Sequence, residues 1–198
     1  MQEPARLHDR PIDGRTARSL RTREAIVDAT IAVLEEGDLR PTAPRVAERA
    51  GVSVRSIFQH FADLEALHAA VAERLVERVS VLVVPVPVDV ALAERLDRFV
   101  DQRCALLEAV TPIRRAADVH GPFSPEITAR LRDGQAYLRR ELVETFRPEL
   151  VAGDPDRLDA LDTALSWATW EGLRAGLGRT PDEAARVVRK LAAAALSV

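Results

Sequence analysis

Two side chains on one short segment, Arg55 and Gln59, are of the types that read nucleic-acid bases. An arginine can donate two hydrogen bonds to guanine, and a glutamine can pair in the same bidentate way with adenine. The two residues are four positions apart, so they would lie on one face of a helix, with Ser56 and His60 beside them. Such a helix could bind in the major groove of a duplex.

The residues before this segment predict the turn that would present it. Thr42 can cap a first helix, and Ala47 is small enough to let two helices cross closely. Gly51 can adopt the left-handed conformation of a tight turn, and Ile57 can anchor the second helix in a core. These positions predict two short helices joined by a turn.

Ser53 offers an N-cap for the second helix, which would run from Val54 to about Phe61. Residues 42–61 therefore predict a helix-turn-helix. A packed helical hairpin with solvated polar residues would have the same periodicity, so this segment by itself leaves both interpretations open.

The charge of the chain does not identify a partner. The 198 residues carry a net charge of −3, whereas residues 1–62 carry ten arginines against nine carboxylates. The distribution of charge matters more for binding than its sum. We expect the arginines near the segment to converge on DNA: Arg21, Arg23, Arg45 and Arg55. The acidic residues of the preceding helix would face away from it: Asp28, Glu35 and Glu36.

The beginning of the chain is basic. Residues 1–23 carry six arginines against three carboxylates. A flexible basic arm over residues 1–18 could reach phosphates or a minor groove. A solvated tail would have the same composition, so both interpretations stay open.

The order of these motifs resembles the N-terminal domain of TetR-family transcriptional regulators. The resemblance rests on five stretches: Arg23–Ala29, Val33–Leu34 with Gly37, Val46–Ser53, Ser56–Phe61 and Leu64–Leu67. It covers about residues 19–67 and does not extend clearly past the fourth helix. It implies a helix-turn-helix domain over residues 19–64 and a ligand-binding and dimerisation domain over residues 65–198. The resemblance also implies a homodimeric repressor that binds a pseudo-palindromic operator in double-stranded DNA and is released from it by a small-molecule ligand.

We expect DNA contacts at nine positions. The base-reading residues would be Arg55, Ser56 and Gln59, with Arg45 reaching a base or a phosphate. The residues that fix the position on DNA would be Arg23, Thr42, Ser53, Phe58 and His60. Phe58 stands where the family usually has tyrosine, and Leu64 where it usually has lysine, so this chain lacks two donors to phosphate.

Helical periodicity over nearly every segment predicts an all-α fold of about nine helices, with a three-helix head joined by a long fourth helix to the rest. The fourth helix would run from Asp63 until Pro85. Residues 81–84 could instead form a strand, but no second strand-like segment could pair with it. The later helices are expected at about 90–110, 113–119, 125–146, 155–176 and 181–196, with loops at 121–125 and 148–153.

The last two helices are strongly apolar, so they either close a monomeric core or pair with a second copy. Small residues recur every four positions in the first of them, from Ala160 to Gly176, which permits close helix crossing. A capping box from Thr180 to Glu183 opens the second. By the resemblance we expect a homodimer interface at Ala160, Ala164, Ala168, Gly172, Val187, Val188, Leu191 and Ala195.

Larger or polar side chains on apolar stripes are candidates for a pocket that binds an unknown effector. They are Phe99, Arg103, Cys104, Leu107, His120, Phe123, Tyr137, Trp167 and Trp170. Ordinary core packing is the more frequent explanation for each of them.

An enzyme is the main rival interpretation. Cys104 and His120 could form a thiolate pair, but no nucleophile motif surrounds either residue, and a helical cysteine is usually an inert apolar side chain. Asp118 and His120 are the nearest approach to a metal-ligand spacing. We therefore expect no catalysis, no cofactor and no metal. A helical interaction module with a decayed DNA head, motivated by Phe58 and Leu64, is a further alternative.

Cysteine usage and hydropathy predict the compartment. The single cysteine excludes an internal disulfide and fits a reducing environment. Residues 1–20 contain no apolar core of a secretory signal, and the longest apolar stretch, residues 79–88, is too short to span a bilayer. We expect a cytoplasmic, nucleoid-associated protein without a membrane partner.

Overall fold

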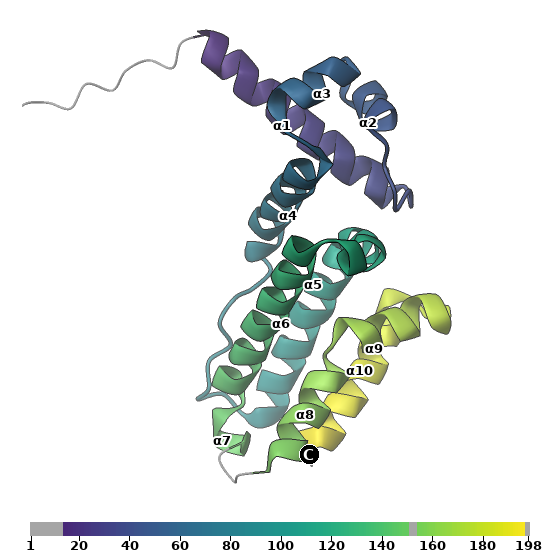
Figure 1. Cartoon of the computed structure of the whole chain (residues 1–198). Helices are drawn as coiled ribbons and strands as arrows, with labels where there is room; N and C mark the ends of the chain where they lie inside the picture. Colours follow the sequence, from purple (N-terminus) through teal and green to yellow (C-terminus); the bar gives the residue numbers. More distant parts are fainter. Residues whose placement is uncertain (1–13, 151–153, 197–198) are drawn as a thin grey trace, which may run out of the picture. The chain divides into compact units, whose positions relative to one another are not determined.

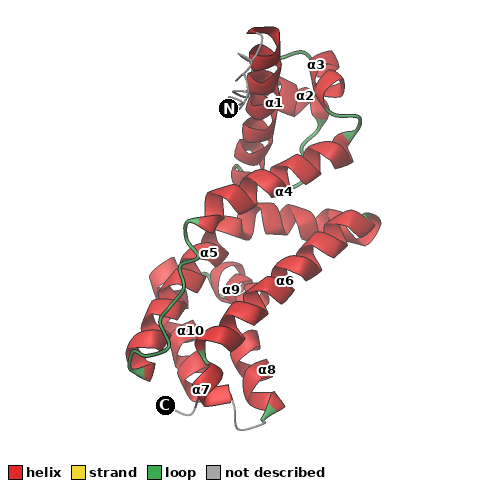
Figure 2. Ribbon diagram, turned by 90° about the vertical axis from the view of Figure 1, so that its left-hand side faces the viewer, coloured by secondary structure: helices red, strands yellow, loops and turns green. Residues whose placement is uncertain are grey.

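The computed structural model describes residues 14–150 and 154–196. All regular elements of these residues are helical, as the all-α prediction requires (Figure 2). The chain divides into two compact units, one up to Val71 and the other from Ala72. The division falls inside a helix, beyond the predicted domain boundary at residue 64.

The first unit is a small helical bundle (Figure 1). It contains α1 (Gly14–Glu35), α2 (Ala43–Ala50), α3 (Val54–His60) and the first half of α4 (Leu64–Ser80). One face of α1 packs against α2 and α3, and Ile26 and Val33 on this face are fully buried. The Thr30 hydroxyl, also buried, donates to the Ile26 carbonyl at 2.8 Å, so no polar group is left unpaired there.

The beginning of α1 differs from the expected flexible arm over residues 1–18. Residues 14–18 form the first turn of α1, whereas residues 1–13 lie outside the described part of the chain.

The predicted caps of the helix-turn-helix are confirmed. The Thr42 hydroxyl accepts from the Arg45 amide at 3.5 Å, and the Ser53 hydroxyl accepts from the Ser56 amide at 3.1 Å. Gly51 ends α2 in the left-handed region with φ 67°, as predicted. These bonds satisfy amides that a helix start leaves without a partner.

Among the described residues, six helical elements contribute buried side chains to the core of the second unit. Its elements after α4 are α5 (Leu92–His120), η1 (Gly121–Phe123), α6 (Pro125–Thr145), α7 (Arg147–Leu150), α8 (Pro155–Ala164), α9 (Trp167–Glu171), the π-helical η2 (Gly172–Gly176) and α10 (Pro181–Leu196). Phe99 and Phe146 meet edge to face at 5.3 Å between ring centroids. Leu142 of α6, Leu161 of α8 and Val188 of α10 are fully buried around them.

Two buried arginines connect α5 to its neighbours. Arg95 donates to the Val88 carbonyl at 2.9 Å and pairs with Glu149 of α7. Arg103 donates to the Leu138 carbonyl of α6 at 3.0 Å. Burial lowers the pKa of the Arg103 guanidinium, and the charge of nearby Glu141 opposes that effect. Removing either arginine's partners would leave a costly buried charge.

The prediction that Pro112 ends a helix is wrong, because α5 continues through it to His120. A proline inside a helix removes one backbone hydrogen bond and costs about 3 kcal/mol. Leu107 before it and Ala116 after it are both buried, so packing on both sides of the proline outweighs that cost.

The fourth helix is shorter than predicted, and residues 81–84 are neither helix nor strand. Pro85 disfavours helical geometry at the residue before it. The Val84 amide donates instead to the Gln102 side chain of α5 at 2.9 Å.

The predicted helix over residues 155–176 is interrupted after Ala164. Ser166 caps a new helix: its hydroxyl accepts from the Thr169 amide at 3.2 Å. The four-residue repeat of small side chains from Ala160 to Gly176 predicts one continuous helix, and Ser166 does not contradict it because serine also occurs inside helices. The predicted loop at 121–125 contains η1, and α7 covers the first residues of the predicted loop at 148–153, whose residues 151–153 lie outside the described part of the chain.

The two glycines 51 and 134 form a matched pair for testing the turn. Gly51→Ala should destabilise the protein by about 1–2 kcal/mol, because the left-handed region strains a residue with a Cβ. Gly134→Ala, inside α6 with open space around its Cα, should stabilise by about 0.5–1 kcal/mol. Urea unfolding followed by circular dichroism measures both changes, and shifts in the same direction would contradict the role of Gly51.

Candidate nucleic-acid interface

The exposed face of α3 carries the residues that the sequence singled out. Arg55 and Gln59 are exposed, whereas Ser56 and His60 are half-buried. Ile57, on the opposite side, is fully buried and holds α3 against the bundle. The predicted orientation of α3 is therefore the one that the structure has.

Arg55 and Gln59 have no protein partner. Within the described part of the chain, neither side chain takes part in a hydrogen bond or an ion pair. The polar groups of both side chains are exposed to solvent. A ligand can therefore bind them without first breaking a hydrogen bond within the protein.

Arg45 differs from Arg55, because two carboxylates hold it. Its guanidinium lies 3.3 Å from Glu36 and 3.3 Å from Glu48, and Glu36 also pairs with Arg49 at 2.8 Å. Glu36, which we expect to face away from DNA, therefore lies beside two arginines of α2. All of these side chains are well exposed, and such ion pairs contribute at most about 1 kcal/mol, so they can exchange for a phosphate.

The other residues that we expect to contact DNA differ in their contacts and in how exposed they are. Thr42 and Ser53 use their hydroxyls as helix caps. The Arg23 guanidinium lies over the Phe61 ring at 4.8 Å from its centroid, which fixes the side chain beside the end of α3. Phe58 is 50% exposed, an unusual environment for a phenylalanine that has no role in a core.

A shallow, open hollow between α1 and α3 includes residues that sequence reasoning missed. From α3 and the turn before it, the lining residues are Val52, Ser53, Ser56, Gln59 and His60; from α1 they are Arg15, Arg18, Ser19 and Thr22. The four α1 residues have the spacing i, i+3, i+4 and i+7, which identifies one face of a helix. The prediction of a flexible arm over residues 1–18 did not take the helical spacing of Arg15 and Arg18 into account.

The predicted pocket residues of the second unit lie in different environments. Phe99, Cys104, Leu107 and Trp170 are packed in the core, and Arg103 is buried beside Phe99. Two hollows among the described residues are open surface depressions, and neither includes any of the nine candidates. The more exposed candidates lie apart from that core: Phe123 at 85% exposure, Tyr137 at 46% and half-buried His120.

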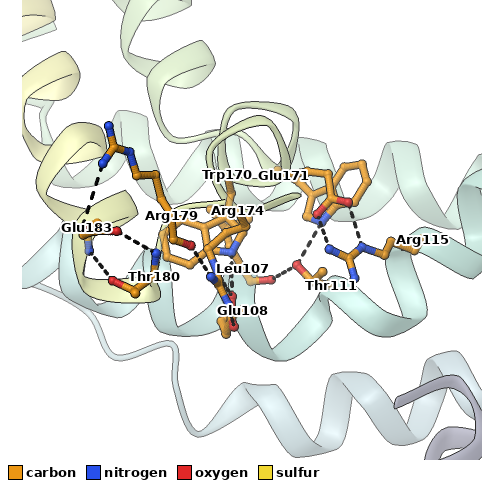
Figure 3. A network of polar contacts seen from close by, with 11 residues as sticks. Leu107, Glu108, Thr111, Arg115, Trp170, Glu171, Arg174, Arg179, Thr180 and Glu183 are labelled. Atoms are coloured by element: carbon orange, nitrogen blue, oxygen red, sulfur yellow. Dashed lines mark hydrogen bonds and ion pairs between the residues drawn. The ribbon is translucent and has the colours of Figure 1, made fainter. Parts of the chain in front are cut away.

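The two tryptophans are held by a polar network between α5 and the α9–η2 segment (Figure 3). The Trp170 indole donates to Glu108 at 3.0 Å, and the Trp167 indole donates to Thr111 at 3.2 Å. Arg174 donates to both oxygens of Glu108 at 3.0 and 2.7 Å. The hydrogen bonds from Arg174 are the main reason why the pKa of Glu108 lies below its usual value.

A second ion pair extends this network. Arg115 of α5 donates to both oxygens of Glu171 at 2.7 and 3.0 Å, as Figure 3 shows. The polar groups of Trp167 and Trp170 are therefore satisfied inside the protein, which accounts for their place in packing rather than in a cavity.

The predicted dimer interface divides into two groups. Ala164 and Val188 belong to the core of the chain itself, so the prediction that they meet a second copy is wrong. Their side chains face inward where α8 and α10 pack together. The exposed members are Ala160, Ala168, Gly172 and Leu191, and the half-buried members are Val187 and Ala195.

The structure offers little for the rival interpretations within the described ranges. These residues contain no group of three or more potential metal ligands. Burial raises the pKa of the Cys104 thiol to about 12, which opposes formation of a nucleophilic thiolate. No described helix is long and apolar enough to cross a bilayer.

Cys104 should therefore resist thiol reagents in the native protein. At pH 8 we expect Ellman's reagent to label it slowly, and to label it at once after unfolding in guanidinium chloride, because only the unfolded thiol has an ordinary pKa. The absorbance of the released thiolate measures both rates. Equal rates in the two states would contradict the burial of this thiol.

Comparisons with known proteins agree with the geometry of the first unit. Residues 26–71 match the family model described as bacterial regulatory proteins, tetR family. A search of the curated proteins finds no match.

Solved structures extend the similarity to the whole fold. A transcriptional regulator from Rhodococcus sp. Rha1 has a TM-score of 0.68 at 19% identity, with 90% of this chain and 96% of that chain covered. A TetR transcription regulator from Haloarcula marismortui has a TM-score of 0.65 at 20% identity, with 90% and 97% covered. A TetR family transcriptional regulator from Pseudomonas syringae has a TM-score of 0.61 at 26% identity, with 88% and 95% covered.

Proposed function

Residues 26–71 form a TetR-family domain within a chain that has the fold of TetR-family regulators, and from this premise we propose that the protein is a sequence-specific DNA-binding transcriptional regulator. The function is one of binding, not of catalysis. Its site is the exposed face of α3 in the first unit.

The observation that carries this proposal is the state of Arg55 and Gln59. Both are exposed on a short, capped helix, and neither has a partner among the described residues. Both side chains can form bidentate bonds to base edges, to guanine for Arg55 and to adenine for Gln59. Ser56 lies nearly one turn before Gln59 and is half-buried. Arg23, over the Phe61 ring at the end of α3, and Arg45 at the start of α2 add positive charge to the same unit.

We propose that the active form is a homodimer, because one short recognition helix contacts only a few base pairs. Two copies related by a two-fold axis would read a pseudo-palindrome. Exposed apolar side chains on the last helices support this assembly: Leu191 of α10 is 45% exposed, and Leu177 just after η2 is 69% exposed. Ala160, Ala168 and Gly172 add small exposed residues on α8, α9 and η2.

The output we propose is repression that a small-molecule effector relieves, in the bacterial cytoplasm where the DNA lies. An effector changes DNA affinity only if it prefers one conformation of the dimer over another. The tight packing around Trp170 means that such a molecule would have to separate α9 from α5, and the bonds of Glu108 and Glu171 would resist that separation.

Selection of bound sequences from random duplex DNA tests the proposed function. The purified full chain should enrich a palindromic motif. Arg55→Ala and Gln59→Ala should each lose affinity for that motif by about 1–3 kcal/mol and relax the preference at one position of each half-site. Binding to random duplex should change far less, because contacts to bases contribute little there.

Arg40→Ala is the matched control, since it removes one exposed arginine from the same unit but not from α3. Its selected motif should be that of the unchanged protein. Equal losses on specific and random DNA for Arg55→Ala and Gln59→Ala would refute base reading by α3. Absence of any enriched motif would favour a helical interaction module whose DNA head has decayed.

Light scattering tests the dimer. The unchanged protein should have twice the chain mass of 21.8 kDa at micromolar concentration. Leu191→Glu should shift the mass toward that of one chain, because the substitution puts a charge into an apolar interface. Val143→Glu, on exposed α6, carries the same charge and should leave the mass unchanged. A single-chain mass for the unchanged protein would exclude the dimer.

A further inference from the structure

The first turns of α1 extend beyond the part of the chain that matches the family. The match begins at residue 26, whereas α1 begins at Gly14. This extension carries Arg15, Arg18, Ser19 and Thr22, which we call the α1 stripe. Their spacing puts all four on one side of the helix.

The α1 stripe faces the recognition helix across the shallow hollow described above. Ser53, Ser56, Gln59 and His60 form the opposite wall. Gln59, one of the two base-reading residues, therefore borders the same open space as the arginines of the α1 stripe. Any duplex in contact with Gln59 passes close to this stripe.

The charge of the hollow favours an anion. Arg15 and Arg18 line it, and no aspartate or glutamate is among its lining residues. On α1, Glu24 and Asp28 fall outside the spacing of the stripe. A planar guanidinium matches the geometry of a phosphate group and keeps its positive charge at any physiological pH.

The side chains of the α1 stripe differ in whether their donors are exposed for a ligand. The Thr22 hydroxyl already donates to the Arg18 carbonyl at 3.0 Å, so it shapes the wall rather than donating to a ligand. Ser19 is exposed and has a hydroxyl on the same side. The charge and the exposed donors of the stripe therefore come from Arg15, Arg18 and Ser19. Arg15 also takes part in an interaction within the protein, which it would exchange for a phosphate.

We propose that the α1 stripe is a second DNA-contacting element that binds the phosphate backbone next to the bases read by α3. This inference rests on the proposed function. The stripe positions α3 along the duplex without reading sequence, because phosphates carry no base identity. A rigid helix can do this with less loss of conformational entropy than a flexible arm of the same composition.

The salt dependence of binding tests this proposal in the full-length protein. Removing two phosphate contacts per bound head should reduce the slope of log K against log salt by about 1.8 for each head, since each contact contributes about 0.9. We therefore expect Arg15→Gln/Arg18→Gln to have a shallower slope and weaker binding on cognate and random duplex alike. The motif selected from random DNA should not change.

Arg40→Gln is the matched control, because Arg40 is exposed in the same unit but does not line the hollow. It should keep the slope of the unchanged protein. Circular dichroism should show the same helix content and melting curve for all three proteins.

The outcomes separate this proposal from the proposed function. If the double variant keeps the slope of the unchanged protein and still selects the motif, the α1 stripe does not bind phosphate, while the DNA-binding function stands. If the double variant selects a different motif, the α1 stripe reads bases, and the proposal of a sequence-neutral contact is wrong. If the unchanged protein selects no motif, the proposed function itself fails.

Discussion

The burial of the inner side of α3 is the constraint on which the candidate interface depends. Ile57 is fully buried and Phe61 is 3% exposed, so the helix has only one rotational position in which both reach the core. That position turns Arg55 and Gln59 outward. The left-handed turn at Gly51 sets the path of the chain into α3, and the serine cap satisfies its first amides. Apolar burial, not a bond made by the polar side chains, therefore orients the face proposed to read DNA.

The second unit shows a different balance between packing and polar contacts. Its core contains aromatic and aliphatic side chains, but two buried arginines and the network around Glu108 connect its helices. Removing one partner of the buried Arg95–Glu149 pair would cost more than the pair contributes, because the other partner stays without water. The more exposed pairs of Glu108 and Glu171 add hydrogen bonds of defined geometry between α5 and the α9–η2 segment. This makes the arrangement of α5 and α9 specific. It also explains why Trp167 and Trp170, which looked like candidates for a ligand cavity, have their indole donors engaged within the chain.

Features determined by interactions within a few residues were predictable. The caps at Thr42 and Ser53 and the turn at Gly51 are confirmed, because each depends on a side chain or a glycine and on the amides of the adjoining turn. Predictions of where helices begin and end failed where contacts with residues far away in the sequence determine those ends. Pro112 lies inside a helix because buried residues on both sides hold it there. The break after Ala164, the helical turns in two predicted loops and the early end of α4 likewise depend on contacts that periodicity does not contain.

The candidate interface shows the same division. The sequence by itself determined that the chain is helical, that a turn joins two short helices, and that Arg55 and Gln59 share an outer face, since these follow from local periodicity and caps. Only the tertiary structure decided that Glu36 holds Arg45 and that the α1 stripe faces α3. It also decided that Val188 lies in the core of its own chain. Which side chains meet across helices depends on crossing angles and on the summed burial of many residues, and no short stretch of sequence contains that information.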